Sequence, residues 1–204
     1  MTTSTKSSVT LHRDRPLFEV TLPVQYNATG AARTGEKILL TVRVINGIRH
    51  LTVGQSQRLL HIELTNEDDY GFLYTLQIGE DDYPALKKEQ SLRVDFGDFA
   101  SQFIELVKNC DPSSTQTQHP SHSLNIEAGS QTTSTATRQR GSPASHFHSS
   151  YLEFVEATAF KNVSVLKLRL REGNDEDIKG FLGDHLQLVS RRIFSFRWEV
   201  ACGW

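Results

Sequence analysis

The sequence predicts an α+β fold that is mostly β. We expect an antiparallel β-sandwich or barrel of about seven strands, capped by a helical hairpin and followed by the start of a C-terminal coiled-coil helix. Two observations carry this prediction. Short segments of alternating apolar and polar residues recur along the chain, which is typical of strands buried on one face. Between 81 and 109 the apolar residues change to a spacing of three and four, which is typical of helices that cover a sheet.

The N-terminal part predicts a tail and a first hairpin. Residues 1–13 are polar and rich in Thr and Ser, so we expect them to be a disordered tail. Alternating apolar residues predict strands over Pro16–Tyr26 and Ile38–Ile45. Asn46 and Gly47 are expected to follow the second strand as the start of a loop.

The central run, from Leu59 to Cys110, predicts a second hairpin and the helices. Apolar residues alternate on both sides of an acidic turn that ends at Gly71. A short helix is expected over Tyr83–Gln90 and a short strand over Leu92–Phe96, after which Asp98 is the expected N-cap of an amphipathic helix. That helix carries one apolar stripe, made of Phe99, Phe103, Leu106, Val107 and Cys110.

A low-complexity insert at about 111–150 interrupts the expected head domain, residues 14–173. Within it, Ser123–Ala128 alternates and predicts a short strand, whereas Gln131–Pro143 is expected to be mobile, with fast amide exchange and early proteolytic cutting. Strands are then expected over Tyr151–Glu156 and Val163–Leu170. The turn between them carries one large apolar residue, Phe160.

The last segment, 174–200, predicts a stalk helix that begins a coiled coil. Asp175 is the expected cap, with Glu176 and Asp177 in the first turn. Apolar residues then recur in heptad phase, which favours pairing with a second copy. The seam residues are Leu182, Leu186, Val189 and Ile193.

Composition narrows the function classes. A chain of 204 residues with 37% hydrophobic residues predicts one globular domain with a real core. A formal charge of −2 argues against a nucleic-acid or anionic membrane partner, and no apolar run has the length of a membrane span. Because Cys110 and Cys202 stand far apart and no signal-peptide core is present, we expect a soluble intracellular protein with reduced cysteines.

Neither an enzyme nor a metal protein is expected, and no cofactor is implied. The histidines that could suggest a metal site lie in low-complexity sequence without a nearby cysteine; they are His119, His122, His146 and His148. The acidic clusters at 67–69 and 80–82 are explained as a turn and a helix start, and no nucleophile–base pair or phosphate-binding glycine loop accompanies them.

Two blocks carry a resemblance to a known family. They are TNEDDYGFLYTLQIGEDDYPALKKEQSLRVDFGDFASQFIELVKNC and FVEATAFKNVSVLKLRLREGNDEDIKGFLGDHL, in that order. The first resembles the signature segment of the spindle assembly abnormal protein 6 family of centriolar cartwheel proteins. The second resembles the end of the same N-terminal head domain. The chain departs from the family at its end, because it stops at Trp204 where the family continues into a long coiled coil.

The resemblance implies a structural scaffold of the centriole or basal-body cartwheel, located in the cytoplasm and cytoskeleton at the centrosome. Coiled-coil dimers joined head to head would build a ninefold ring needed for centriole duplication, so the implied partners are the chain itself and other centriolar assembly proteins. Phe160 would insert into an apolar pocket on the neighbouring head. The candidate pocket residues come from the helical hairpin and its sheet edge: Val94, Phe96, Phe99 and Phe103.

Each of these roles has a purely structural alternative. Phe160 could instead fold back onto its own hairpin, and each of the four pocket candidates could be ordinary core. For the whole chain the alternative function is a monovalent adaptor or repair-scaffold-like interaction head. Self-association that depends on Phe160 separates the two functions.

Overall fold

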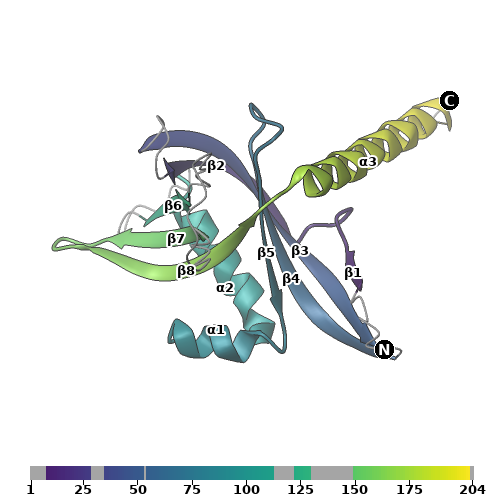
Figure 1. Ribbon diagram of the computed structural model, residues 1–204. Coiled ribbons are helices and arrows are strands. Elements are labelled where there is room, and N and C mark those ends of the chain that lie inside the picture. The colour runs from purple at the N-terminus through teal and green to yellow at the C-terminus, as the bar shows by residue number, and fades with distance from the viewer. Residues whose placement is uncertain (1–7, 29–34, 53, 113–121, 130–148, 203–204) are drawn as a thin grey trace, which may run out of the picture.

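The computed structural model describes residues 8–28, 35–52, 54–112, 122–129 and 149–202, the side chains of Thr52 and of 191–202 excepted (Figure 1). The strands are β1 Ser8–Leu11, β2 Phe18–Ala28, β3 Glu36–Thr52, β4 Gln55–Thr65, β5 Leu73–Gly79, β6 His122–Ala128, β7 Ser150–Ala157 and β8 Asn162–Glu172. The helices are α1 Tyr83–Glu89, α2 Phe96–Asn109 and α3 Asp175–Cys202.

The strands form one eight-stranded sheet in the order β1-β3-β2-β6-β7-β8-β5-β4. A further pairing between β3 and β4 closes all of them except β1 into a ring. Neighbouring strands run antiparallel, apart from β2 and β6, which run parallel. The β5–β8 ladder is the shortest, with Tyr74 opposite Glu172 and Thr75 opposite Arg171. The predicted mostly-β fold, an antiparallel sandwich or barrel capped by a helical hairpin, is confirmed, with the parallel β2–β6 pair as the one departure among the described strands.

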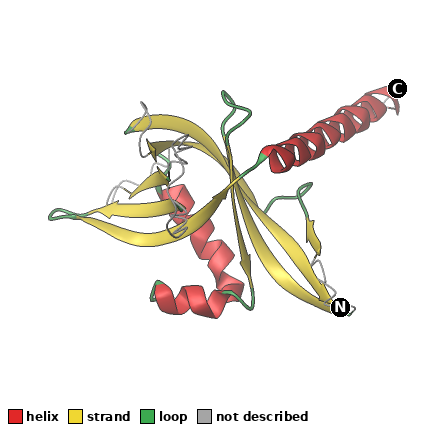
Figure 2. Ribbon diagram, in the orientation of Figure 1, coloured by secondary structure: helices red, strands yellow, loops and turns green. Residues whose placement is uncertain are grey.

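Helix α2 completes the core of the ring. It runs across the space between the β7–β8 hairpin and the β4–β5 hairpin, with α1 at its N-terminal end (Figure 2). Its apolar stripe buries Phe99, Phe103 and Val107. The Phe103 ring lies 5.4 Å from the ring of Phe154 on β7 in an edge-to-face contact, the geometry that aromatic pairs prefer. The stripe therefore covers the core, as its spacing predicts.

The first hairpin is longer than the sequence suggests. Strand β3 does not end before Asn46 and Gly47 but continues to Thr52, and β4 starts at Gln55, directly after Gly54. Gly54 has a φ of +86°, the left-handed region that favours glycine, so the turn is at this residue. The expectation of a loop from Asn46 onward was wrong. An Asn–Gly pair can adopt the backbone angles of a turn, but it can also continue a strand, as it does here.

Part of the expected disordered tail is also a strand. Residues Ser8–Leu11 form β1, which pairs with β3 from Gly47 to His50. This pairing exists because β3 extends past the end of β2 and presents a free edge there. A Cβ at Gly47 would lie 2.8 Å from Leu11 Cδ2, so the glycine lets β1 approach closely.

Two helix boundaries differ from the prediction. Residues 92–95 are a connector rather than a strand, because their apolar side chains pack against the core and no strand lies beside them. Helix α2 therefore starts after Asp95 and not after Asp98. Helix α3 is capped by Asn174 instead of Asp175: Asn174 Oδ1 accepts the backbone N–H of Glu176 at 3.0 Å and of Asp177 at 2.9 Å.

One carboxylate is buried on the outer face of the ring. Glu63 on β4 has no exposed surface. Its Oε1 lies 3.0 Å from His61 Nε2 and accepts a hydrogen bond from Arg13 Nε at 2.8 Å. Burial acts to raise the pKa of Glu63, but the hydrogen bond with His61 and the charge of Arg13 outweigh it, so the pKa lies below its ordinary value.

This lowered pKa predicts a loss of stability in acid. A carboxyl group with a lower pKa in the folded state stabilises the fold fully above its unfolded pKa, about 4.5, and the contribution disappears as the pH falls through the lower folded value. Urea unfolding of the wild type should therefore show a falling free energy of unfolding below that pH. Glu63→Gln should be less stable at neutral pH and have a flatter acid limb; an unchanged acid limb would contradict the assignment.

Candidate functional site

The tip of the β7–β8 hairpin presents an exposed aromatic ring. Phe160 is 98% exposed. The turn is held by Thr158, whose backbone N–H donates to Lys161 O at 3.0 Å and whose hydroxyl donates to the same oxygen at 2.7 Å. The hairpin projects away from the rest of the ring (Figure 1). The alternative in which Phe160 folds back onto its own hairpin is therefore excluded for this chain.

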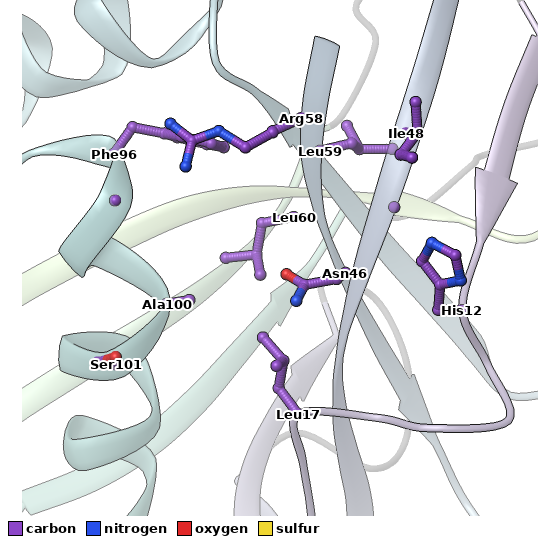
Figure 3. A pocket seen from close by; sticks show the side chains of 12 residues that line it. His12, Leu17, Asn46, Ile48, Arg58, Leu59, Leu60, Phe96, Ala100 and Ser101 are labelled. Carbon is purple, nitrogen blue, oxygen red and sulfur yellow. The ribbon is translucent and has the colours of Figure 1, made fainter. Parts of the chain in front are cut away.

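A pocket lies between α2 and the β3–β4 hairpin (Figure 3). Its volume is about 500 Å³. Helix α2 contributes Phe96, Gly97 and Ala100 to one wall, and β4 contributes Leu60 to the floor opposite. Leu17, on the connector that leads into β2, forms another side and is 45% exposed. The remaining lining is partly polar, from His12, Asn46, Arg58 and Ser101, so the pocket is a concave surface of mixed character that a single large side chain could enter.

Arg58 lies at the rim of this pocket. Its guanidinium carbon is 5.4 Å from the centroid of the Phe96 ring, within cation–π range. Arg58 Nε also donates to Glu80 Oε2 at 3.0 Å, and this hydrogen bond lowers the pKa of Glu80. At the rim of the pocket, the positive charge of Arg58 is therefore balanced by Glu80 and lies over the Phe96 ring.

The four pocket residues expected from the sequence do not share one environment. Phe99 and Phe103 are 3% and 1% exposed and have ring partners in the core, so a second protein has almost no surface of theirs to contact. Val94 is half-buried, and its carbonyl accepts the Tyr83 hydroxyl at 2.9 Å. Phe96 alone of the four lines the pocket described above. Phe99 and Phe103 are thus corrected to core, because an amphipathic helix points its central stripe inward.

The other residues that line the pocket were not predicted from the sequence. Leu17, Leu60 and Ala100 come from three separate segments, and only the folded chain brings them together. Leu17 carries the one available signal, since it is apolar and stands just before the alternating pattern of β2.

The expected seam of α3 is largely exposed over its described part. Leu186 is 67% exposed and Val189 is 41% exposed, whereas Leu182 is half-buried. The side chain of Ile193 lies outside the described residues. An exposed apolar stripe on a helix that leaves the domain is a surface that a second helix can cover.

The chemistry suggested by the histidines has no counterpart in the described ranges. No group of three or more His, Cys, Asp or Glu side chains that could hold a metal ion occurs there. His122 lies in β6, and His119, His146 and His148 lie outside the described residues, as does the segment 131–143 expected to be mobile. Among the described helices, none is both long and apolar enough to cross a bilayer.

Comparison with known proteins identifies a consistent set of relatives. The family described as centriolar protein SAS N-terminal domain matches residues 16–170. Spindle assembly abnormal protein 6 homolog of Mus musculus is 35% identical over 147 residues, which is 72% of this chain and 20% of that protein. The homolog of Danio rerio is 34% identical over 131 residues, 64% of this chain and 19% of that protein. The chain therefore spans about a fifth of the length of these relatives.

Solved structures show the same fold. An N-terminal fragment of Leishmania SAS-6 that contains part of its coiled-coil domain has a TM-score of 0.69 at 22% identity, covering 92% of this chain and 94% of that one. An N-terminal fragment of Drosophila melanogaster Sas-6, dimerised via its coiled-coil domain, has a TM-score of 0.64 at 20% identity, covering 98% and 83%.

Proposed function

The chain belongs to the family of centriolar SAS N-terminal domains, and we propose that it is a self-associating structural head whose Phe160 tip inserts into the pocket of a neighbouring copy. The observation that carries this proposal is that the same chain has an almost fully exposed aromatic ring and a partly apolar pocket. The pocket wall at Phe96 is part of the helical hairpin from which the sequence predicts the acceptor.

The positions of the tip and the pocket support head-to-tail association of successive copies. The tip belongs to the β7–β8 turn, whereas the pocket belongs to α2, β3 and β4, so the contact joins two different surfaces. Such heterologous contacts close into a ring when the rotation between copies permits it, and otherwise form a filament. We propose the ninefold ring of the cartwheel as the closed form.

A second contact would strengthen the first. Burial of one Phe contributes about 1.5–3 kcal/mol, so a tip-in-pocket contact is weak on its own. Pairing through the exposed stripe of α3, at Leu186 and Val189, would link heads in twos and make each further tip contact intramolecular. The proposed setting is the centriole at the centrosome or basal body, with other centriolar assembly proteins as further partners. The proposed role is structural and not enzymatic.

The experiment blocks the pocket without damaging the fold. Gly97 lines the pocket, and a Cβ added there would meet nothing within 4 Å. Gly97→Trp should therefore fold normally, fill the pocket and abolish tip-dependent association in concentration-dependent sedimentation. Gly97→Ala is the matched control: it keeps the pocket open and should associate like the wild type.

Mixing two defective variants gives the decisive measurement. A chain with Phe160→Ala retains its pocket, and a chain with Gly97→Trp retains its tip. If the contact is heterologous, fluorescently labelled copies of the two should bind each other although neither associates through the tip with itself. Failure of this complementation, with both variants folded, would favour the monovalent adaptor instead.

A further inference from the structure

The link between the head and α3 contains an ion-pair bridge that the tip contact does not use. At its inner end is Glu63, which is buried on the outer face of β4. Arg13, on the connector between β1 and β2, covers it and is 24% exposed itself. The connector is fixed to the ring at two further points, because His12 N–H donates to Asn46 O at 3.0 Å and Arg43 Nη2 donates to Arg13 O at 3.3 Å.

The outer end of the bridge is on α3. Arg13 Nη1 donates to Asp184 Oδ2, so one guanidinium contacts a buried carboxylate of the head and a half-exposed carboxylate of the helix. A cavity of about 440 Å³ separates α3 from β1 beside this pair, with Leu11 on one side and Leu188 on the other. Direct apolar packing between the helix and the head is therefore incomplete here, which leaves the ion pair as the bridging contact described at this position.

The base of α3 is fixed separately. Gly173 N–H donates to Leu73 O at 2.8 Å, and a Cβ at Gly173 would lie 2.9 Å from Leu73 Cδ2. The segment between β8 and α3 is therefore in close contact with β5 where the helix begins. Asp184 lies nine residues after Asp175, which is about 14 Å along the axis. Two fixed points at this separation define a direction, whereas the base alone leaves the helix free to tilt.

We propose that Arg13 is a positioning residue that sets the angle at which α3 leaves the head. Its planar guanidinium holds two carboxylates in fixed directions, which a lysine cannot do in the same way. The buried end is rigid because Glu63 is enclosed, so the position of Asp184 follows the head. A displacement of about 3 Å at Asp184 would tilt α3 by about 12° and move the end of the 28-residue helix by about 9 Å.

The consequence for assembly follows from this lever. In a structure built through the tip and α3, the angle between them decides the direction in which each copy adds. The inference stands on the intramolecular contacts alone, so it does not depend on the tip entering a neighbouring pocket.

The test measures the direction of α3 in the whole chain. Nitroxide labels are placed at Tyr70→Cys, on the exposed β4–β5 turn, and at Ser190→Cys on α3, in a Cys202→Ser background diluted with unlabelled chain. Cys110 is buried, and burial raises the pKa of its thiol to about 12, so it should remain unlabelled. Pulsed electron resonance then gives the distribution of distances between head and helix.

Asp184→Asn should broaden this distribution or shift it by several ångströms, with an unchanged melting temperature because Glu63 keeps Arg13. Arg13→Lys should give the same broadening. Glu176→Gln removes the same charge from the exposed first turn of α3 and should leave the distribution narrow. About 1 M salt should broaden the wild type but not Asp184→Asn further.

The contrary results are equally definite. An unchanged distribution in Asp184→Asn would show that Arg13 does not orient the helix. Equal broadening in Asp184→Asn and Glu176→Gln would show a general effect of helix charge, and would also overturn the proposal. Loss of association through Phe160 does not change the head-to-helix distances in the wild type or in Asp184→Asn. Failure of the tip contact and failure of the Arg13 bridge are therefore distinguishable.

Discussion

Phe160→Ala should remove head-to-head association and leave the melting temperature nearly unchanged. The ring is 98% exposed, so its truncation removes almost no packing from the isolated chain, and surface changes of this kind stay within about 0.5 kcal/mol. In the pair, the pocket loses the side chain that fills it, which amounts to about 1.5–3 kcal/mol or about a tenfold to hundredfold loss of affinity. Sedimentation over a concentration series and thermal unfolding measure the two effects.

Two further variants sharpen this prediction. Phe160→Asp should be worse than alanine, because its carboxylate would have to lose its hydration beside Leu17, Leu60 and Phe96, and the cation at the rim, Arg58, is already paired with Glu80. Val165→Ala is the matched control, since Val165 lies on the same hairpin and is 37% exposed but stands away from the turn. If Phe160→Ala unfolds the domain, or if Val165→Ala weakens association equally, Phe160 is not the anchor.

Phe103→Ala should have the opposite profile, a large loss of stability. Phe103 is 1% exposed, and its ring packs against Phe154 and Phe99 where α2 meets the ring of strands. Truncation of a buried Phe costs about 3–5 kcal/mol, from lost burial and the cavity left behind. Urea unfolding should show this as a lower midpoint.

The control for Phe103 keeps the volume close to the original. Phe103→Leu should lose less stability than the alanine variant, because the side chain still fills most of the site. A loss below about 1 kcal/mol for Phe103→Ala would mean that α2 is not part of the core. It would then reopen the reading in which Phe103 faces a partner.

The strands of the ring were predictable because each has one buried face. The alternation of Leu60, Ile62 and Leu64 gave both the strand and the face that lies in the core. The Ser123–Ala128 segment was predictable for the same reason, although low-complexity sequence surrounds it. The position of Phe160 between two paired strands favoured exposure of its ring but left the folded-back alternative open, and the family resemblance favoured exposure further.

What the sequence did not predict depends on contacts between distant segments. β1 is a strand only because β3 extends beyond β2, and β3 extends because Asn46 and Gly47 continue the strand. The pocket combines residues from His12 to Ser101, and Glu63 is buried because Arg13, fifty positions earlier, lies over it. Local periodicity contains none of this information.

The order of the last elements has a mechanical consequence. The turn that carries Phe160 leads directly into β8, and β8 leads to α3 through Gly173 and Asn174. At about 3.4 Å per residue, the 11 residues of β8 form an extended strut of about 37 Å between tip and helix. A pull applied at Phe160 would therefore reach α3 along a continuous strand, supported laterally by the ladder with β7, without crossing any long loop.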